Sequence, residues 1–289
     1  MTQKAPPVRI KPSRLEGDAL EPLRSLLLGI VQGATEFIPV SSSAHLVLVP
    51  WLAGWPKPGL LFDTIVHWGT LVGVLAYFRG QVWELAAAWL GSIRKRKVHS
   101  QEAKLAWLIV LGTAPAAVMG VLWSDFFSAL FDSPVKVAWL LLVTGAVMTL
   151  SEKVGGRSRD LGSLSVMDAL LVGLAQGVAI APGISRSGLT MAAGLFRGLR
   201  REDVARYSFL LSIPIIVGAG ASQIAELSQP SLAQQWPALL LGFSSALFSG
   251  FLSIAFLLSF LRSHRLYPFA VYCWLFGGFC LLLAYMGYR

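Results

Sequence analysis

The sequence predicts an all-α integral membrane protein with an inverted-topology repeat, comprising six transmembrane helices and two re-entrant helix pairs. Three observations lead to this prediction. Of the 289 residues, 55% are apolar and only 13% are charged, and several apolar runs approach the ~20 residues that cross about 30 Å of hydrocarbon. Two apolar segments are interrupted at a proline and continue into hydroxyl residues. These two segments also resemble each other, which indicates an internal repeat.

The formal net charge of +9 raises the question of a nucleic acid partner. The basic residues lie in short clusters at the ends of apolar runs, where orientation in the membrane explains them. We therefore expect no nucleic acid binding. Cys273 and Cys280 lie in the last apolar run and would be about 10 Å apart along one helix, beyond disulfide reach.

The first half of the chain begins with a broken segment. The first 24 residues lack the apolar core of a cleavable signal. Residues 1–19 are expected to form a mobile tail, followed by one membrane domain over residues 20–289. Residues 20–38 are apolar but stop at Pro39, short of a crossing, so a re-entrant arm is expected, with residues 41–52 as its return. Crossings are then predicted at residues 60–78, with an amphipathic extension to Ile93, and at residues 105–123 and 135–150.

The second half repeats this order. A broken segment is predicted at residues 164–181, interrupted at Pro182-Gly183, with a return over residues 185–196. Crossings should follow at residues 207–225, 237–261 and 267–288. The connections at residues 124–134 and 226–236 carry no Lys or Arg, whereas four connections are basic, at residues 94–97, 152–159, 197–206 and 262–265. The positive-inside rule makes the basic face cytoplasmic, although the basic tail would then lie outside, against the rule.

The repeat predicts how the two broken segments meet. Residues 26–33 match residues 170–177 at a constant offset, and each copy precedes three predicted crossings. Because an odd number of crossings inverts the second copy, repeat one (about 20–151) and repeat two (about 163–289) enter the membrane from opposite sides. Their tips can therefore meet within the bilayer and form one anion site.

The first tip carries candidate catalytic groups. Gln32 and Glu36 share one helix face, and a carboxylate at membrane depth is costly unless it is paired, protonated or metal-bound. Serines 41–43 follow Pro39 where a new helix should begin, and free N–H groups there favour an anion. The alternatives are that Glu36 lies shallow and meets water, and that the serines only cap the helix.

Histidines supply the candidate bases. His45 can share a face with Ser41 or Ser42 and is predicted to act as general base or as nucleophile toward phosphorus. A purely structural histidine is the alternative. His67, inside the first crossing, is a weaker candidate, for which packing or a helix-to-helix hydrogen bond is expected.

The second tip adds a permanent cation, Arg186, which can hold a phosphate through two parallel N–H bonds. Snorkelling to a headgroup is its alternative. Asp168 is predicted to hold Arg186 or complete a metal site, with a helix-end role left open. The residues predicted to bind substrate are Gln32, Ser41, Ser43, Asp168, Gln176, Ser185, Ser187 and Thr190. Together, serine, histidine, glutamate and arginine indicate phosphoryl chemistry.

These motifs closely resemble the undecaprenyl-diphosphate phosphatase family of the bacitracin-resistance type. The resemblance is carried by residues 32–36, 39–45 and 182–190 and covers nearly the whole chain from about Leu20. Two departures are visible: Gln32 stands where the family has Glu or Gln, which weakens a two-carboxylate metal site, and Ala44 replaces an expected glycine.

The resemblance implies a multi-pass enzyme of the bacterial plasma (inner) membrane that removes one phosphate from undecaprenyl diphosphate. This reaction recycles the lipid carrier for peptidoglycan synthesis and confers bacitracin resistance. The family also implies a divalent cation, Mg²⁺ or Ca²⁺, near Glu36, a site open toward the periplasmic (outer) face, and six spans with two re-entrant pairs. The expected partner is the polyprenyl diphosphate lipid within the membrane, and a homodimer is left open.

The mechanistic hypothesis places the diphosphate between the two helix starts, neutralised by Arg186 and the cation. Ser42 attacks the terminal phosphorus, and His45 or Glu36 takes its proton; His45 as nucleophile stays open. A lipid-phosphate transporter or flippase with the same repeat is the main alternative function. An acid-phosphatase-like lipid phosphatase needs a second histidine after its arginine motif, and none lies between Arg186 and His264. A purely structural membrane protein would leave Glu36 and Arg186 unexplained.

Overall fold

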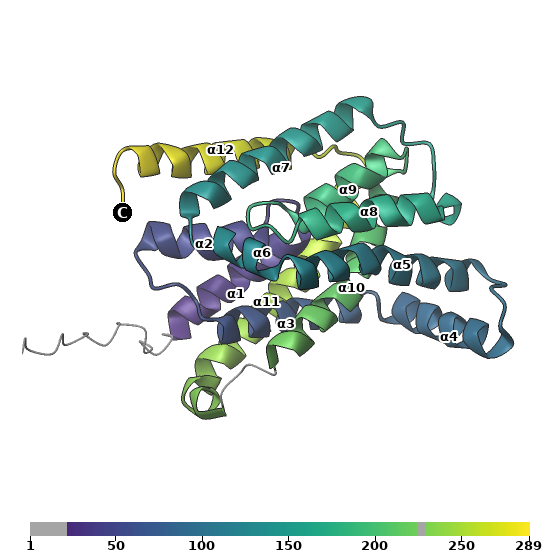
Figure 1. Cartoon of the computed structure of the whole chain (residues 1–289), viewed down its shortest axis with the longest axis horizontal. Helices are drawn as coiled ribbons and strands as arrows, with labels where there is room; N and C mark the ends of the chain where they lie inside the picture. The colour runs from purple at the N-terminus through teal and green to yellow at the C-terminus, as the bar shows by residue number, and fades with distance from the viewer. Residues whose placement is uncertain (1–21, 225–228) are drawn as a thin grey trace, which may run out of the picture.

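The computed structural model describes residues 22–224 and 229–289 and is almost entirely helical over them (Figure 1). The predicted tail at residues 1–19 and part of the predicted connection at residues 226–236 lie outside the described residues. Within the described part the only β pairing is an isolated bridge between Arg159 and Leu199.

Six of the described helices are long and apolar enough to cross a membrane. This number confirms the six predicted crossings. The helices are α3 (Leu60–Tyr77), α5 (Gln101–Leu122), α7 (Pro134–Val154), α10 (Arg201–Ile224), α11 (Gln229–Leu261) and α12 (Tyr267–Tyr285).

Four shorter helices form the two broken segments. They are α1 (Pro22–Phe37) with α2 (Ser42–Ala53), and α8 (Val166–Val178) with α9 (Arg186–Phe196). Each break falls at the predicted proline, since proline cannot continue the hydrogen-bonding ladder of a helix. Gly183 completes the second break with a φ of 99°, and a Cβ there would lie 2.3 Å from the carbonyl oxygen of Val137. A glycine is therefore required at this turn.

The open ends of the two pairs lie at opposite ends of the molecule (Figure 1). At one end, the Tyr288 hydroxyl donates to the carbonyl of Leu52, at the end of α2. At the other end, Arg159, just before α8, donates to the carbonyl of Arg197, just after α9. Two oppositely oriented re-entrant pairs require this arrangement, which supports the predicted re-entrant entry and inverted repeat. Both remain predictions.

The repeated glycines let each broken arm approach a helix of the other half. A Cβ on Gly29 of α1 would lie 2.4 Å from the carbonyl oxygen of Gly242 on α11. A Cβ on Gly173 of α8 would lie 2.3 Å from the carbonyl oxygen of Gly112 on α5. Small residues allow such close approach between helices where little hydrophobic force acts between them. The matching sequences at residues 26–33 and 170–177 thus serve the same packing role in the two halves.

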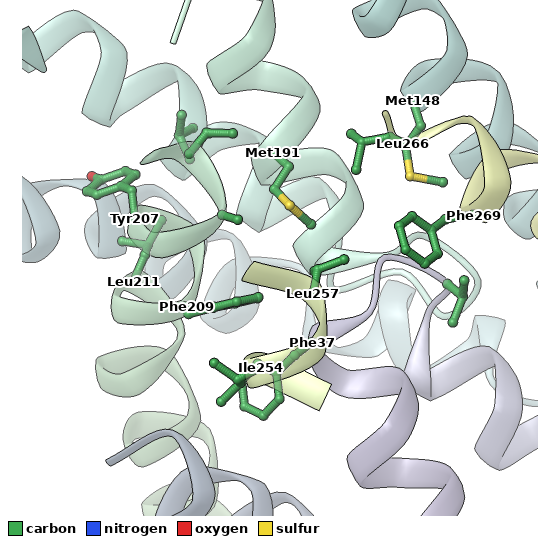
Figure 2. Packing of buried hydrophobic residues seen from close by; sticks show 14 of the residues in the cluster. Phe37, Met148, Met191, Tyr207, Phe209, Leu211, Ile254, Leu257, Leu266 and Phe269 are labelled. Atoms are coloured by element: carbon green, nitrogen blue, oxygen red, sulfur yellow. The ribbon is translucent and has the colours of Figure 1, made fainter. Parts of the chain in front are cut away.

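The buried core lies directly behind the tip of the first arm (Figure 2). Phe37, the last residue of α1, packs edge-on against Phe209 of α10 with ring centroids 5.3 Å apart. Ile254 and Leu257 of α11 lie beside these rings, and all four side chains are fully buried (Figure 2). Two helices of the second half therefore fix the position of Phe37, close to the first break.

Several boundaries differ from prediction. The amphipathic extension to Ile93 is a separate helix, α4 (Arg79–Lys95), and a short helix, α6 (Ser124–Leu130), occupies the connection predicted at residues 124–134. Phe127 of α6 is buried, which favours a helical turn there. The basic stretch after α9 is largely the start of α10, where Glu202 and Asp203 lie in the first turn and favour helix initiation. The helix α11 likewise begins eight residues before the predicted residue 237, at Gln229.

The close approach of α1 and α11 predicts the effect of enlarging Gly29. We expect Gly29→Leu to destabilise the protein by about 1–3 kcal/mol or more, because the new side chain must displace backbone. The measurement is thermal unfolding in detergent, with Gly278→Leu on α12 as the control, since a Cβ at Gly278 meets nothing within 4 Å. Equal melting temperatures for the two variants would contradict the packing argument.

Candidate active site

Two helix starts line one cavity of about 550 Å³. Ser41 is the N-cap of α2, and its side chain accepts a hydrogen bond from the backbone N–H of Ala44. Ser185 is the N-cap of α9, and its side chain accepts from the N–H of Gly188. Both serines line the cavity. Because helix N-termini favour negative charge, the cavity is built to receive an anion.

The side chains that carry chemistry converge on Glu36, the penultimate residue of α1. Its carboxylate is buried, with 7% of the residue exposed. Ser42 donates a hydrogen bond of 2.5 Å to Glu36 Oε2, and Gln32 donates one of 3.0 Å to the same oxygen. Arg186 Nη2 lies 2.8 Å from Glu36 Oε1. The ion pair joins the two broken segments, as the sequence predicted that their tips would meet.

Arg186 is held in place without using all of its donors. Its Nη1 donates to the carbonyl of Ser208 on α10, and the guanidinium lies 5.9 Å from the ring centroid of Phe37. Arginine has five N–H donors, and the side chain lines the cavity. The guanidinium is therefore positioned by protein contacts and still faces the space where an anion would bind, which disfavours the snorkelling alternative.

His45 does not face the cavity. Its Nδ1 lies 2.8 Å from the carbonyl oxygen of Ser41, and its Nε2 lies 2.7 Å from the hydroxyl of Tyr272 on α12. A carbonyl oxygen only accepts, so Nδ1 carries the proton and Nε2 accepts from the tyrosine when the ring is neutral. The ring also stacks on Phe276. Both nitrogens are thus engaged away from Ser42, and the predicted general-base contact is not present.

The other predicted hydroxyl groups fall into two groups. Ser43 lines the cavity, with its hydroxyl 3.2 Å from that of Ser41. Ser187 is buried, lies 3.2 Å from the Ser185 hydroxyl and donates to the carbonyl of Ile38, which ties the second tip to the first. Thr190 is fully buried and donates to the carbonyl of Arg186, so it supports the arginine and does not line the cavity.

Gln176, the repeat equivalent of Gln32, is not brought to the site. Its side chain is buried on α8, and neither its oxygen nor its nitrogen has a hydrogen-bond partner among the described residues. Ile180, one helical turn later, lines the cavity instead. The second half therefore has no carboxylate at the position that Glu36 occupies in the first.

The prediction that Asp168 holds Arg186 or a metal is wrong. Asp168 forms a capping box with Ser165 at the start of α8 and pairs with Arg159 and Arg197, each at 2.6 Å. Burial alone would raise the pKa of this carboxyl, but the hydrogen bonds from the two arginines outweigh it and lower the pKa of Asp168 below its ordinary value. Asp168 has the helix-end role that the sequence left open.

Comparison with known proteins identifies the family. The sequence model of the family described as bacitracin resistance protein BacA matches residues 25–279 of the chain. A protein of Thermomicrobium roseum named Undecaprenyl-diphosphatase is 44% identical, and the match covers 86% of this chain and 93% of the relative. The chain belongs to the bacitracin resistance protein BacA family.

Further relatives agree with this family assignment. Undecaprenyl-diphosphatase 2 of Stutzerimonas stutzeri is 43% identical over 90% of this chain and 97% of the relative. A protein of Methanosphaera stadtmanae named Undecaprenyl-diphosphatase is 42% identical over 92% of this chain and 99% of the relative. The membrane fold and the family resemblance read from the sequence are therefore confirmed.

The family resemblance implies a divalent cation near Glu36, but the side chains at this site do not fit a resident metal ion. In the described part of the chain no three His, Cys, Asp or Glu side chains converge in a way that could hold one. The expected ligand, Glu36, has Oε1 bound by Arg186 and Oε2 bound by Ser42 and Gln32. The protein side chains alone do not supply the ligand set that Mg²⁺ or Ca²⁺ requires.

The sequence did not predict the positions of two residues near the site, Tyr272 and His67. Tyr272 carries no motif signal, because its partner His45 is distant in sequence and only the fold brings the helices together. His67 was expected to pack or to bridge helices, but it lines the cavity with Nε2 3.8 Å from Glu36 Oε2. The signal available in the sequence was an ionisable side chain within a predicted crossing, four residues after Asp63.

The lack of a set of metal-binding side chains around Glu36 predicts how the substrate-free protein responds to Mg²⁺ and Ca²⁺. We expect Mg²⁺ and Ca²⁺ to leave its melting temperature unchanged relative to a chelator, because a ligand that binds only the folded state would raise it. The measurement is thermal unfolding in detergent across a metal titration. A saturable rise in melting temperature that Glu36→Gln abolishes would reveal a resident site and contradict this expectation.

Proposed function

We propose that this chain is an undecaprenyl-diphosphate phosphatase of the bacterial plasma membrane. It would release inorganic phosphate from undecaprenyl diphosphate, recycle the lipid carrier for peptidoglycan synthesis and thereby confer bacitracin resistance. The observation that carries this proposal is the contact of Ser42 and Arg186 with the same buried carboxylate, Glu36, at the wall of one cavity. The names of the relatives support the choice of substrate.

The cavity suits a lipid diphosphate. Its polar wall combines Arg186 with the two helix starts at Ser41 and Ser185, which supply cationic and N–H donors for phosphate oxygens. The rest of the lining includes apolar side chains of α3, of the break between α8 and α9, and of α10, among them Leu60, Ile180 and Ile216. The headgroup would lie at the helix starts and the polyprenyl chain along the apolar lining.

The hydrogen bond from Ser42 to Glu36 supports the roles that we propose for the first step. Ser42 Oγ attacks the terminal phosphorus, and its proton passes to Glu36 Oε2 at 2.5 Å, within reach of a general base. Arg186 offsets the negative charge of the phosphoryl group. Glu36 takes the role that the sequence left open between it and His45. His45 instead links the start of α2 to Tyr272 and so holds the serines in position.

The proposal also includes the side of the membrane toward which the cavity opens. The cavity also includes Lys57 and Asp132, which lie on the α2–α3 and α6–α7 connections and pair at 3.1 Å. These connections lie at the end opposite to the basic residues 94–97. By the positive-inside rule the site then opens toward the periplasmic face. A homodimer stays a prediction from the sequence.

The activity is tested with purified protein in detergent and a polyprenyl diphosphate. We expect release of inorganic phosphate, a loss of about 10²-fold or more in Arg186→Ala and Ser42→Ala, and unchanged release in Arg262→Ala. Arg262 is exposed, directly follows the C-terminal end of α11, and pairs only with Glu202 among the described residues. It does not line the cavity. A chelator arm with Mg²⁺ or Ca²⁺ added back tests the expected cation dependence.

Three results would count against the proposed roles. Wild-type release by Ser42→Ala rejects the serine nucleophile, and a phosphoenzyme trapped on His45 does the same. Absence of hydrolysis by the wild-type protein, together with transfer of the intact lipid between leaflets of a vesicle, would favour the transporter or flippase alternative.

The orientation is tested by labelling in intact cells. We expect a membrane-impermeant maleimide to label Asp132→Cys in intact cells and to label Lys97→Cys only after permeabilisation, because the α6–α7 and α4–α5 connections that carry these residues lie toward opposite ends of the molecule. Background labelling should be low, since Cys273 and Cys280 are both buried. The reverse pattern would place the cavity mouth on the cytoplasmic side.

A further inference from the structure

His67 lies where a second proton-transfer group would be needed. It projects from α3 into the cavity that holds Ser42 and Arg186, and about a third of its side chain is exposed there. Among the four histidines of the chain, His45 is turned away toward Tyr272, and His264 is exposed on the α11–α12 connection. His99, before α5, does not line the cavity.

One hydrogen bond fixes which nitrogen of His67 faces the cavity. Nδ1 lies 2.6 Å from the carbonyl oxygen of Asp63, one turn earlier on α3. Because a carbonyl oxygen only accepts, Nδ1 carries a proton. The other nitrogen, Nε2, lies 3.8 Å from Glu36 Oε2. A neutral ring would therefore present a lone pair toward a carboxylate, whereas a protonated ring would present an N–H.

The charged groups around His67 come from several elements. Glu36 on α1 and Asp63 on α3 are acidic, and Asp63 Oδ1 is buried with no hydrogen-bond partner among the described residues. Arg186 on α9 is the opposing cation and is already paired with Glu36. Lys57 and Asp132 pair with each other farther along the same cavity. The α10 side chains that line the cavity carry no ionisable group.

We infer that His67 is a catalytic residue that donates a proton to the departing lipid monophosphate and later accepts one from water. This inference rests on the proposed phosphatase function and deepens it. Glu36 is the only base in contact with Ser42 among the described residues, and once it has taken the serine proton it cannot also serve the leaving group. His67 is the titratable imidazole that shares the cavity with both.

The proton transfers balance over the two half-reactions. In the first, the Ser42 Oγ–P bond forms, Glu36 takes the serine proton, and the bond from phosphorus to the bridging oxygen breaks. The bridging oxygen leaves on the lipid monophosphate with the electron pair and takes the proton from His67 Nε2. In the second, water attacks phosphorus and gives its proton to His67, while the P–Oγ bond breaks and Ser42 recovers its proton from Glu36. Both groups end as they began.

The experiment compares His67→Gln with wild type and with His264→Gln, which removes an exposed histidine outside the cavity. We expect His67→Gln to lower kcat for a polyprenyl diphosphate by about 10²–10⁴-fold and to change KM little. Wild-type kcat should fall at alkaline pH, and this alkaline limb should be absent from the variant. His264→Gln should keep both the rate and the limb.

The outcomes distinguish a failure of the role inferred for His67 from a failure of the proposed phosphatase function. A wild-type kcat that does not change with rising pH overturns the role of His67 without need of any variant, as does a folded His67→Gln that keeps the wild-type rate. Wild-type protein that releases no phosphate overturns the proposed function itself. If His67→Gln does not fold, the wild-type pH profile alone carries the test.

Discussion

The ion pair between Glu36 and Arg186 is the interaction on which the site depends. A lone carboxylate or guanidinium at membrane depth costs several kcal/mol, and pairing offsets that cost only with good geometry and further hydrogen bonds. Here Ser42 and Gln32 satisfy the second carboxylate oxygen, and the carbonyl of Ser208 holds the arginine. The same contacts that make the charges tolerable bring a hydroxyl, a base and a cation to one cavity wall.

This pair is possible only because both arms stop within the protein. In the interior of a continuous helix every N–H group is bonded within the helix, whereas a break frees several N–H groups at the new helix start. The N-caps at Ser41 and Ser185 satisfy part of each helix start, and both starts line the cavity. The cost of interrupting the backbone is thus offset locally, and the N–H groups that remain are available to an anionic headgroup.

Much of this arrangement could be predicted from the sequence, because apolar run length, prolines and the repeat are local signals. The six spans and the convergence of Glu36, Ser42 and Arg186 are of this kind. The orientation of His45 was not predictable, since it depends on a hydroxyl from the last helix, Tyr272. Asp168 was misassigned because its arginine partners, unlike Arg186, lie in connections whose course depends on the fold.

The packing of each broken arm on a helix of the other half has a consequence for biogenesis. The glycine face of α1 contacts α11, the penultimate helix of the chain, whereas α8 contacts α5, which is already made. During synthesis the first arm would leave the ribosome long before its partner exists. Until α11 has been made, the glycine face of α1 therefore lacks the helix that covers it in the folded protein.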